Sequence, residues 1–198
     1  MRHKLLCTLG VMVSTLVGFA ASPAGAATTT AVGPYYANPS WDQQLPASTR
    51  FVVLSNWIDT ADPSGGAAVL DRETGLVWEQ SPSATQLPWG GPGVPFSSSA
   101  QYHCNNLNVG NRKGWRLPTL QELVSLVDPS VSPGPTLPSG HPFSSNVRSS
   151  YYWSATTDAK FTGEEWGVQF VSGVVYSDDK GSSFFPWCVR GGQGVDAQ

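Results

Sequence analysis

Charged residues are scarce in this sequence of 198 residues. Asp, Glu, Lys and Arg make up only 13% of the chain, about half of the roughly 25% found in an average globular domain. So few charges exclude a protein built from long exposed helices. A hydrophobic content of 40% and a formal net charge of −3 also exclude intrinsic disorder. Nucleic acid and other polyanions are not expected as partners, because their binding needs concentrated Lys and Arg, and only 11 are present against 14 acidic residues.

The first 26 residues have the features of a secretory signal peptide. A basic region at residues 2–4 precedes an apolar run over residues 5–21, and residues 24–26 read Ala-Gly-Ala, a small-residue cleavage signature. The alternative is a membrane span, but about 17 apolar residues lie at the short end of what crosses a bilayer. We therefore expect cleavage before Ala27. The product would be a secreted or periplasmic protein with a net charge of −5 and no stable membrane span.

Cysteine is also rare. Cys7 lies in the signal peptide, so the exported chain keeps only Cys104 and Cys188, which are separated by 84 residues. Two cysteines in a protein that reaches an oxidising compartment are expected to pair. The alternatives are a metal site, which would need more Cys or His ligands, and a reactive thiol. Neither alternative has local support in the sequence.

Glycine, proline and tryptophan are abundant, with 21, 16 and 8 residues respectively. Gly and Pro divide the chain into short apolar segments, and several of these alternate with a period of two, which is typical of β-strands. We interpret residues 27–65 as an extended lead-in with a possible first strand, residues 66–192 as one domain, and residues 193–198 as a tail. The expected strands are residues 50–54, a hairpin over 68–79, and residues 151–156, 166–171, 174–176 and 184–190.

Two short helices are expected. The serines at 97–99 offer N-caps for the first helix, and apolar positions then recur at the i, i+4, i+7 spacing of one buried face, which includes Cys104. In the second helix, Thr119 and Glu122 fit a capping box, in which each side chain accepts a hydrogen bond from a backbone N–H at the helix start. The buried face of this helix is expected to contain Leu120, Leu123, Val124 and Val127.

Five motifs follow one another in a characteristic order. They are Asp-Arg-Glu-Thr-Gly-Leu-Val-Trp-Glu at 71–79, Tyr-His-Cys at 102–104, Gly-Trp-Arg-Leu-Pro-Thr at 114–119 with Glu122-Leu123, Tyr-Trp-Ser-Ala-Thr at 152–156, and Cys-Val-Arg-Gly-Gly at 188–192. In this order they resemble the Lcl C-terminal domain family, a domain long catalogued as of unknown function and named from a collagen-like bacterial adhesin. The resemblance covers roughly residues 66–192.

The resemblance implies an α+β fold of the C-type-lectin-like kind, with two short helices packed on small twisted antiparallel sheets and long loops. A disulfide between the first helix and the last strand is typical of that fold, which agrees with pairing of Cys104 and Cys188. Members of the family have been linked to adhesion and glycan recognition. The wider fold also carries protein binding and, in one branch, oxidase chemistry. This chain lacks the calcium and sugar motifs of C-type lectins and the cysteine pair of the oxidase branch.

Candidate ligand-binding residues lie in two places. Trp89 is in the Gly-rich loop at residues 88–92, where an exposed aromatic can stack on a sugar or on a partner protein. The alternative for Trp89 is a loop aromatic folded onto the core. Four acidic residues near the end of the domain could supply oxygen ligands to calcium, a hard cation, and are otherwise solvated turn charges. These four are Glu164, Glu165, Asp178 and Asp179.

The remaining motif residues are expected to be structural. His103 and His141 have no Ser, Cys or acidic partner at a recognisable spacing, so no catalytic set is present and an enzyme is not expected. We expect an exported binding module that recognises carbohydrate or a cell surface through its loops, without an obligatory cofactor. The alternative is a protein-interaction or structural envelope module that binds no glycan. Residues expected to be structural are Trp78, Trp115, Trp153 and Trp187 in the core, with Arg116 and Arg190 as partners of carboxylates or backbone carbonyls.

Overall fold

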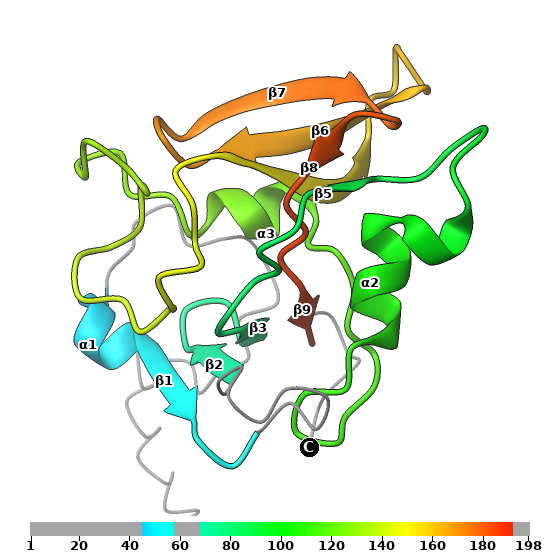
Figure 1. Ribbon diagram of the computed structural model, residues 1–198. Helices are drawn as coiled ribbons and strands as arrows, with labels where there is room; N and C mark the ends of the chain where they lie inside the picture. Colours follow the sequence, from blue (N-terminus) through cyan, green and yellow to red (C-terminus); the bar gives the residue numbers. More distant parts are fainter. Residues whose placement is uncertain (1–44, 58–67, 192–198) are drawn as a thin grey trace, which may run out of the picture. The chain divides into compact units, whose positions relative to one another are not determined.

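The computed structural model describes residues 45–57 and 68–191. The predicted signal peptide, most of the predicted lead-in and the predicted tail lie outside the described residues. Short helices and small antiparallel sheets make up the described part, which confirms the α+β class (Figure 1). The elements are α1 (Ala47–Arg50), β1 (Phe51–Leu54), β2 (Ala68–Asp71), β3 (Leu76–Glu79), β4 (Leu87–Pro88), η1 (Phe96–Ser98), α2 (Ala100–Asn106), α3 (Leu120–Val124), β5 (Tyr151–Thr157), β6 (Glu164–Gln169), β7 (Val174–Asp179), β8 (Ser183–Phe184) and β9 (Val189–Arg190).

The predicted first strand and hairpin belong to one antiparallel sheet with the strand order β1-β2-β3-β9. Val69 of β2 pairs with Trp78 of β3, and both side chains are fully buried. The turn between the two strands ends at Gly75, whose φ of +71° is a left-handed conformation that glycine adopts without steric cost. The local pattern of two apolar runs around a Gly-ended turn is therefore sufficient to predict this hairpin.

The strands predicted in the last third of the domain form a separate sheet with the order β5-β6-β7. Val168 lies at the centre, paired with Tyr152 on one side and Val175 on the other. The predicted turn after β6 is present, with Gly173 at a φ of +75°. β6 lies two residues earlier than predicted, and β7 extends three residues further, because the acidic residues at the far end of this hairpin continue the ladder, with Glu164 opposite Asp179.

The prediction of one continuous strand over residues 184–190 is wrong. β8 pairs with β4, whereas β9 pairs with β3 in the four-stranded sheet. Figure 1 shows this red segment running from the region of β5 down to β3. Pro186 lies between the two strands, and proline has no N–H to donate to a ladder, so regular pairing stops there. The segment therefore joins different sheets instead of extending one.

The same segment separates two hydrophobic cores. Its side chains alternate: Phe185, Trp187 and Val189 pack in the first core, whereas Phe184 and Cys188 pack in the second. The four motif tryptophans are at most 1% exposed, which confirms the prediction that they are structural. The first core contains Phe51, Val69, Trp78, Leu123, Leu126, Phe143, Tyr152, Val168, Phe170 and Trp187, among others, and the second Ala68, Ala100, Cys104, Val109, Trp115, Leu117, Trp153 and Cys188.

Both predicted helices are present. The Thr119 hydroxyl and the Glu122 carboxylate form the predicted capping box at the start of α3. Glu122 also accepts two hydrogen bonds of 2.7 Å from Arg116, whose guanidinium donates to the Gly191 carbonyl as well. The helix is shorter than expected: it ends at Val124, and a further turn carries Val127 into the core. Among the described residues, no helix has the length and apolar character needed to cross a membrane.

A buried ion pair that the sequence did not indicate joins α1 to the hairpin. Arg50 is 1% exposed and donates two hydrogen bonds, of 2.9 and 2.8 Å, to the carboxylate of Asp71, which is fully buried. Arg50 also lies 3.2 Å from Glu73 and donates to the Ser125 carbonyl after α3. A charge that is removed from water needs such partners, because isolated burial is very costly. One guanidinium thus connects the first sheet with α3.

Replacement of Asp71 with Ala is expected to lower the free energy of unfolding by about 3 kcal/mol, because the buried Arg50 would lose both hydrogen bonds to Asp71 and keep only Glu73 as a carboxylate partner. Urea unfolding at neutral pH measures this loss. Arg72→Ala, an exposed change at the adjacent turn residue, is the control and should stay within about 0.5 kcal/mol of the wild type. Equal stability of the two variants would contradict the assigned role of the ion pair.

The Cys104–Cys188 disulfide is confirmed, with the two Cα atoms 5.3 Å apart. The intact exported protein should therefore show no free thiol by mass spectrometry after alkylation without reductant. Detection of two free thiols would contradict the link.

Replacing both cysteines with Ala should lower the free energy of unfolding by about 4–5 kcal/mol in the chain-entropy description, since the link closes a loop of 84 residues.

Candidate functional site

An open groove of about 410 Å³ runs along the outward face of α2. Ser99, Tyr102, His103 and Asn106 line it at the i, i+3, i+4, i+7 spacing of a single helix face. The opposite face of the same helix carries Cys104 into the second core. The remaining lining residues are Leu87, Ser97, Ser98, Leu107 and Asn108.

The groove is lined by polar side chains that are still available for hydrogen bonding. Within the described part of the chain, the hydroxyls of Ser97, Ser98 and Tyr102 and the side-chain amide of Asn108 have no hydrogen-bond partner. None of the lining residues that the structure describes is Asp, Glu, Lys or Arg. The groove therefore offers uncharged donors and acceptors next to an aromatic ring.

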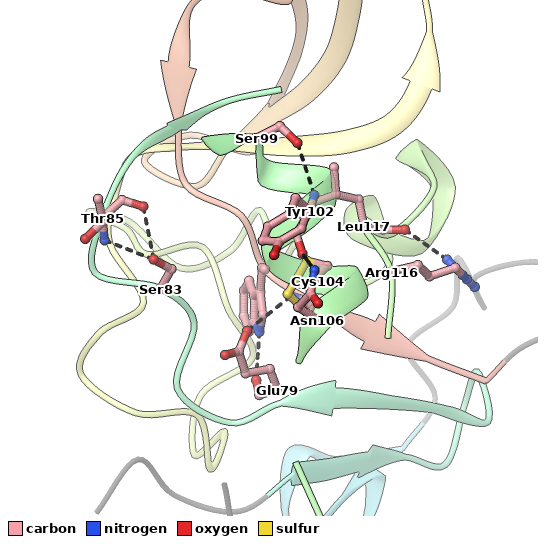
Figure 2. Close-up of a disulfide and its surroundings, with 11 residues drawn as sticks. Glu79, Ser83, Thr85, Ser99, Tyr102, Cys104, Asn106, Arg116 and Leu117 are labelled. Atoms are coloured by element: carbon pink, nitrogen blue, oxygen red, sulfur yellow. Dashed lines mark hydrogen bonds between the residues drawn. A yellow bond between two sulfur atoms is a disulfide. The ribbon is translucent and has the colours of Figure 1, made fainter. Parts of the chain in front are cut away.

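The groove has a rigid frame. The Ser99 hydroxyl caps α2 by accepting a hydrogen bond of 3.1 Å from the Tyr102 N–H, and it donates to the Phe96 carbonyl. The rings of Phe96 and Tyr102 meet edge to face, with centroids 5.4 Å apart. Figure 2 shows Tyr102 and Asn106 beside Cys104, so the helix that carries these groups is tied covalently to the last strand.

A group of potential metal ligands includes His103, which also lines the groove. One ligand atom from each of Glu79, His103 and Cys188 lies within 4.8 Å of the others. The sulfur of Cys188 is bonded to Cys104, so it cannot act as a thiolate ligand. The Glu79 carboxylate accepts a hydrogen bond from the Cys188 N–H at 3.3 Å. In the oxidised protein this group belongs to the surroundings of the disulfide and does not form a metal centre.

Trp89 is half-buried and is not an open platform on its loop. Its indole N–H donates to the Ser154 carbonyl at 2.9 Å, and its ring packs against the second core. The ammonium of Lys180 lies 4.7 Å from the ring centroid. These contacts favour a loop aromatic folded onto the core over a stacking surface for a ligand.

The four acidic residues do not come together as one calcium site. Glu164 lies opposite Asp179 and Glu165 opposite Asp178 in the β6–β7 ladder. Since neighbouring residues of a strand point to opposite faces, each face of the sheet receives only one of these pairs. The carboxylates of Glu164, Asp178 and Asp179 accept local hydrogen bonds from Ser177, Ser182 and Gly181 respectively.

Glu165 differs from its three neighbours because its side chain is fully buried. Lys180 is its ion-pair partner, with Nζ 3.4 Å from the carboxylate. Burial raises the pKa of the Glu165 carboxyl, and contacts with Thr157 and Lys180 oppose part of that rise. Lys180 in turn donates to the Thr162 carbonyl at 2.8 Å. The Glu165 carboxylate is therefore a buried partner of Lys180 and is not available as a ligand for calcium.

The α2 groove was not predicted from the sequence. Only the buried face of this helix was predicted, and the binding site was expected on loops. The available signal was the polar face of the same helix, where Ser99, Tyr102, His103 and Asn106 share the helical spacing. That pattern is common on solvated helices, and only the position of η1 and Leu87 shows that this face is hollowed.

Comparison with known proteins identifies the family. The family model of the Lcl C-terminal domain matches residues 67–190, more than half of the chain. The protein therefore belongs to the Lcl C-terminal domain family, as its motifs predicted. No curated protein matches the sequence. The disulfide fits an extracellular or periplasmic protein, since such links form and persist in oxidising compartments.

Glu165→Gln is expected to change the pH dependence of stability. In the unfolded chain the carboxyl titrates near 4.5, and its pKa is higher in the folded protein. As pH rises through the window between the two values, the unfolded state has lost a proton that the folded state retains, so the free energy of unfolding falls. Gln removes this loss. The variant should therefore be more stable, relative to wild type, at pH 7 than at pH 4.

Urea unfolding at both pH values measures this difference. Glu164→Gln is the control, because it makes the same change one residue away on the opposite face of β6. A Glu165→Gln variant that loses more stability at pH 7 than at pH 4 would show that the pair with Lys180 outweighs the cost of burying the carboxylate.

Proposed function

We propose that this protein is an exported recognition module that binds neutral carbohydrate in the α2 groove. The observation that carries the proposal is the combination of an aromatic wall with uncharged, unsatisfied hydroxyl and amide groups in one groove. The predicted signal peptide, the C-type-lectin-like fold that the family resemblance implies, and the disulfide from α2 to the C-terminal segment support it further.

Sugar chemistry fits this lining. A pyranose ring has an apolar C–H face that stacks on an aromatic side chain, and hydroxyls around its edge that need donors and acceptors. Tyr102 is 36% exposed and Phe96 57% exposed, so aromatic surface is available at the groove edge. The volume of about 410 Å³ lies within the range of small-ligand sites. One or two sugar units would occupy it.

The electrostatics favour a neutral sugar over a sulfated one. The lining has no Lys or Arg, and the predicted exported chain has a net charge of −5, so nothing in the groove compensates sulfate groups. The groove also holds no carboxylate that would recruit calcium. We therefore expect binding to be independent of calcium, with no other cofactor and no catalysis.

A protein-interaction role is the second candidate, and a different surface supports it. β7 lies at the edge of its sheet, and its first two residues, Val174 and Val175, are 55% and 38% exposed. Exposed β-branched residues on an edge strand are suited to pairing with an extended partner strand. Recovery of one stoichiometric envelope protein, lost in a Val174→Lys variant, would favour this role.

The primary test is a broad array of neutral and acidic glycans probed with the purified protein, with and without calcium. We expect a neutral glycan to bind equally under both conditions. Tyr102→Ala should weaken that binding about tenfold, because it removes the aromatic wall and its hydroxyl. Phe161→Ala is the matched control, since Phe161 is a 51% exposed aromatic of the β5–β6 turn that does not line the groove.

Three results would contradict the proposal. The first is the absence of glycan binding, and the second is binding that needs calcium. The third is binding that Tyr102→Ala and Phe161→Ala reduce equally, which would place the ligand elsewhere. Far-ultraviolet circular dichroism and thermal unfolding of both variants distinguish a lost contact from a lost fold.

A further inference from the structure

The segment that leads into β4 also lines a second hollow. The hollow is open, has a volume of about 690 Å³, and is lined by Ala84, Thr85, Gln86, Arg148, Ser150 and Phe185. Leu87, the next residue after Gln86, lines the α2 groove instead. The two hollows therefore share no lining residue, and their ligands can be tested separately.

Arg148 gives this hollow a charge that nothing in its lining compensates. Its guanidinium forms no ion pair and no side-chain hydrogen bond within residues 45–57 and 68–191. Two other arginines of the described chain, Arg50 and Arg116, each hold at least one carboxylate. Within residues 45–57 and 68–191, no Asp or Glu lines the hollow to compete for Arg148. An unpaired guanidinium in a concave surface is an anion-binding group.

The backbone of Arg148 is held in place by a hydrogen bond that leaves the guanidinium unpaired. Its backbone N–H donates to the Tyr152 hydroxyl at 2.7 Å. Burial raises the pKa of Tyr152 to about 12, against the opposing effect of Arg148, so the phenol is neutral at physiological pH. Tyr152 is fully buried in the first core. The hydroxyl thus anchors the backbone of Arg148 without neutralising its side chain.

The other lining groups suit an organic ligand better than a simple ion. The hydroxyls of Thr85 and Ser150 and the side-chain amide of Gln86 have no partner within the described chain. Phe185 contributes partly buried aromatic surface. One cation, three neutral hydrogen-bonding groups and one aromatic ring match a ring-shaped polyol with a single carboxylate.

We propose that the hollow around Arg148 binds the carboxylate of an acidic sugar of about one unit, a hexuronate. The guanidinium would hold the two carboxylate oxygens in a fork, the neutral side chains would bind the sugar hydroxyls, and Phe185 would contact the C–H face. A single guanidinium satisfies one carboxylate but not a polymer that carries several sulfates on each unit. This site stands independently of the neutral groove on α2.

The test is a titration of the full exported protein with sodium glucuronate, followed by changes in protein NMR chemical shifts. Glucose, N-acetylphenylalanine and sodium sulfate are titrated in parallel. Glucuronate is expected to bind most tightly of the four. Arg148→Gln should weaken glucuronate binding at least tenfold, because it keeps a hydrogen-bonding side chain but removes the charged fork. Arg72→Gln, an exposed arginine at the β2–β3 turn, is the matched control and should leave binding unchanged.

Each other outcome counts against the proposal. Glucuronate that does not bind, or that binds Arg148→Gln as well as wild type, overturns the site. Tighter binding of N-acetylphenylalanine would assign the hollow to peptide-like carboxylates and overturn the sugar, and equal binding of sulfate would overturn carboxylate recognition. Thermal unfolding and the amide spectrum verify that Arg148→Gln is folded. Tyr102→Ala separates the two sites: it should weaken neutral-glycan binding about tenfold and leave glucuronate binding unchanged.

Discussion

The disulfide between Cys104 and Cys188 is the constraint on which the rest of the domain depends. Cys188 lies in a segment whose alternate side chains enter two different cores, with Trp187 on one side and the cysteine on the other. The link holds α2 against this segment, so the second core is closed by a covalent bond as well as by packing. A small domain with short strands and long loops gains much from such a link, because its hydrophobic core alone is limited.

The same constraint explains why the surface around α2 can serve recognition. A helix of seven residues has little stability of its own, and α2 is held by its Ser99 cap and by Cys104. Its outward face carries Tyr102 and the polar groups of the groove. Because the helix is already ordered, ligand binding would cost little conformational entropy there. The hollow at Arg148 is supported in the same way, since Tyr152 in the first core holds its backbone. Each proposed site is thus held by contacts with one of the two cores.

Local features were predictable from the sequence, and the reasons are local as well. The hairpin around Gly75 follows from backbone sterics, and the capping box of Thr119 and Glu122 is complete within four residues. The pairing of two cysteines followed from their number and the predicted export. Burial of a charged side chain could not be predicted where its partners are distant in the sequence. Arg50 is buried because Asp71 and Glu73 reach it from another element, and nothing in its own neighbourhood indicates this.

By itself, the sequence determined the family, the α+β class, the two capped helices and the tryptophans of the core, because each depends on short-range pattern, composition or ordered motifs. Only the tertiary structure decided that residues 184–190 join different sheets, that the four acidic residues divide between two faces, and that Trp89 folds inward. It also decided where the surface is hollow. Concave sites arise from elements that are distant along the chain, such as Leu87 beside α2 or Thr85 beside Arg148, and no local pattern records which elements will meet.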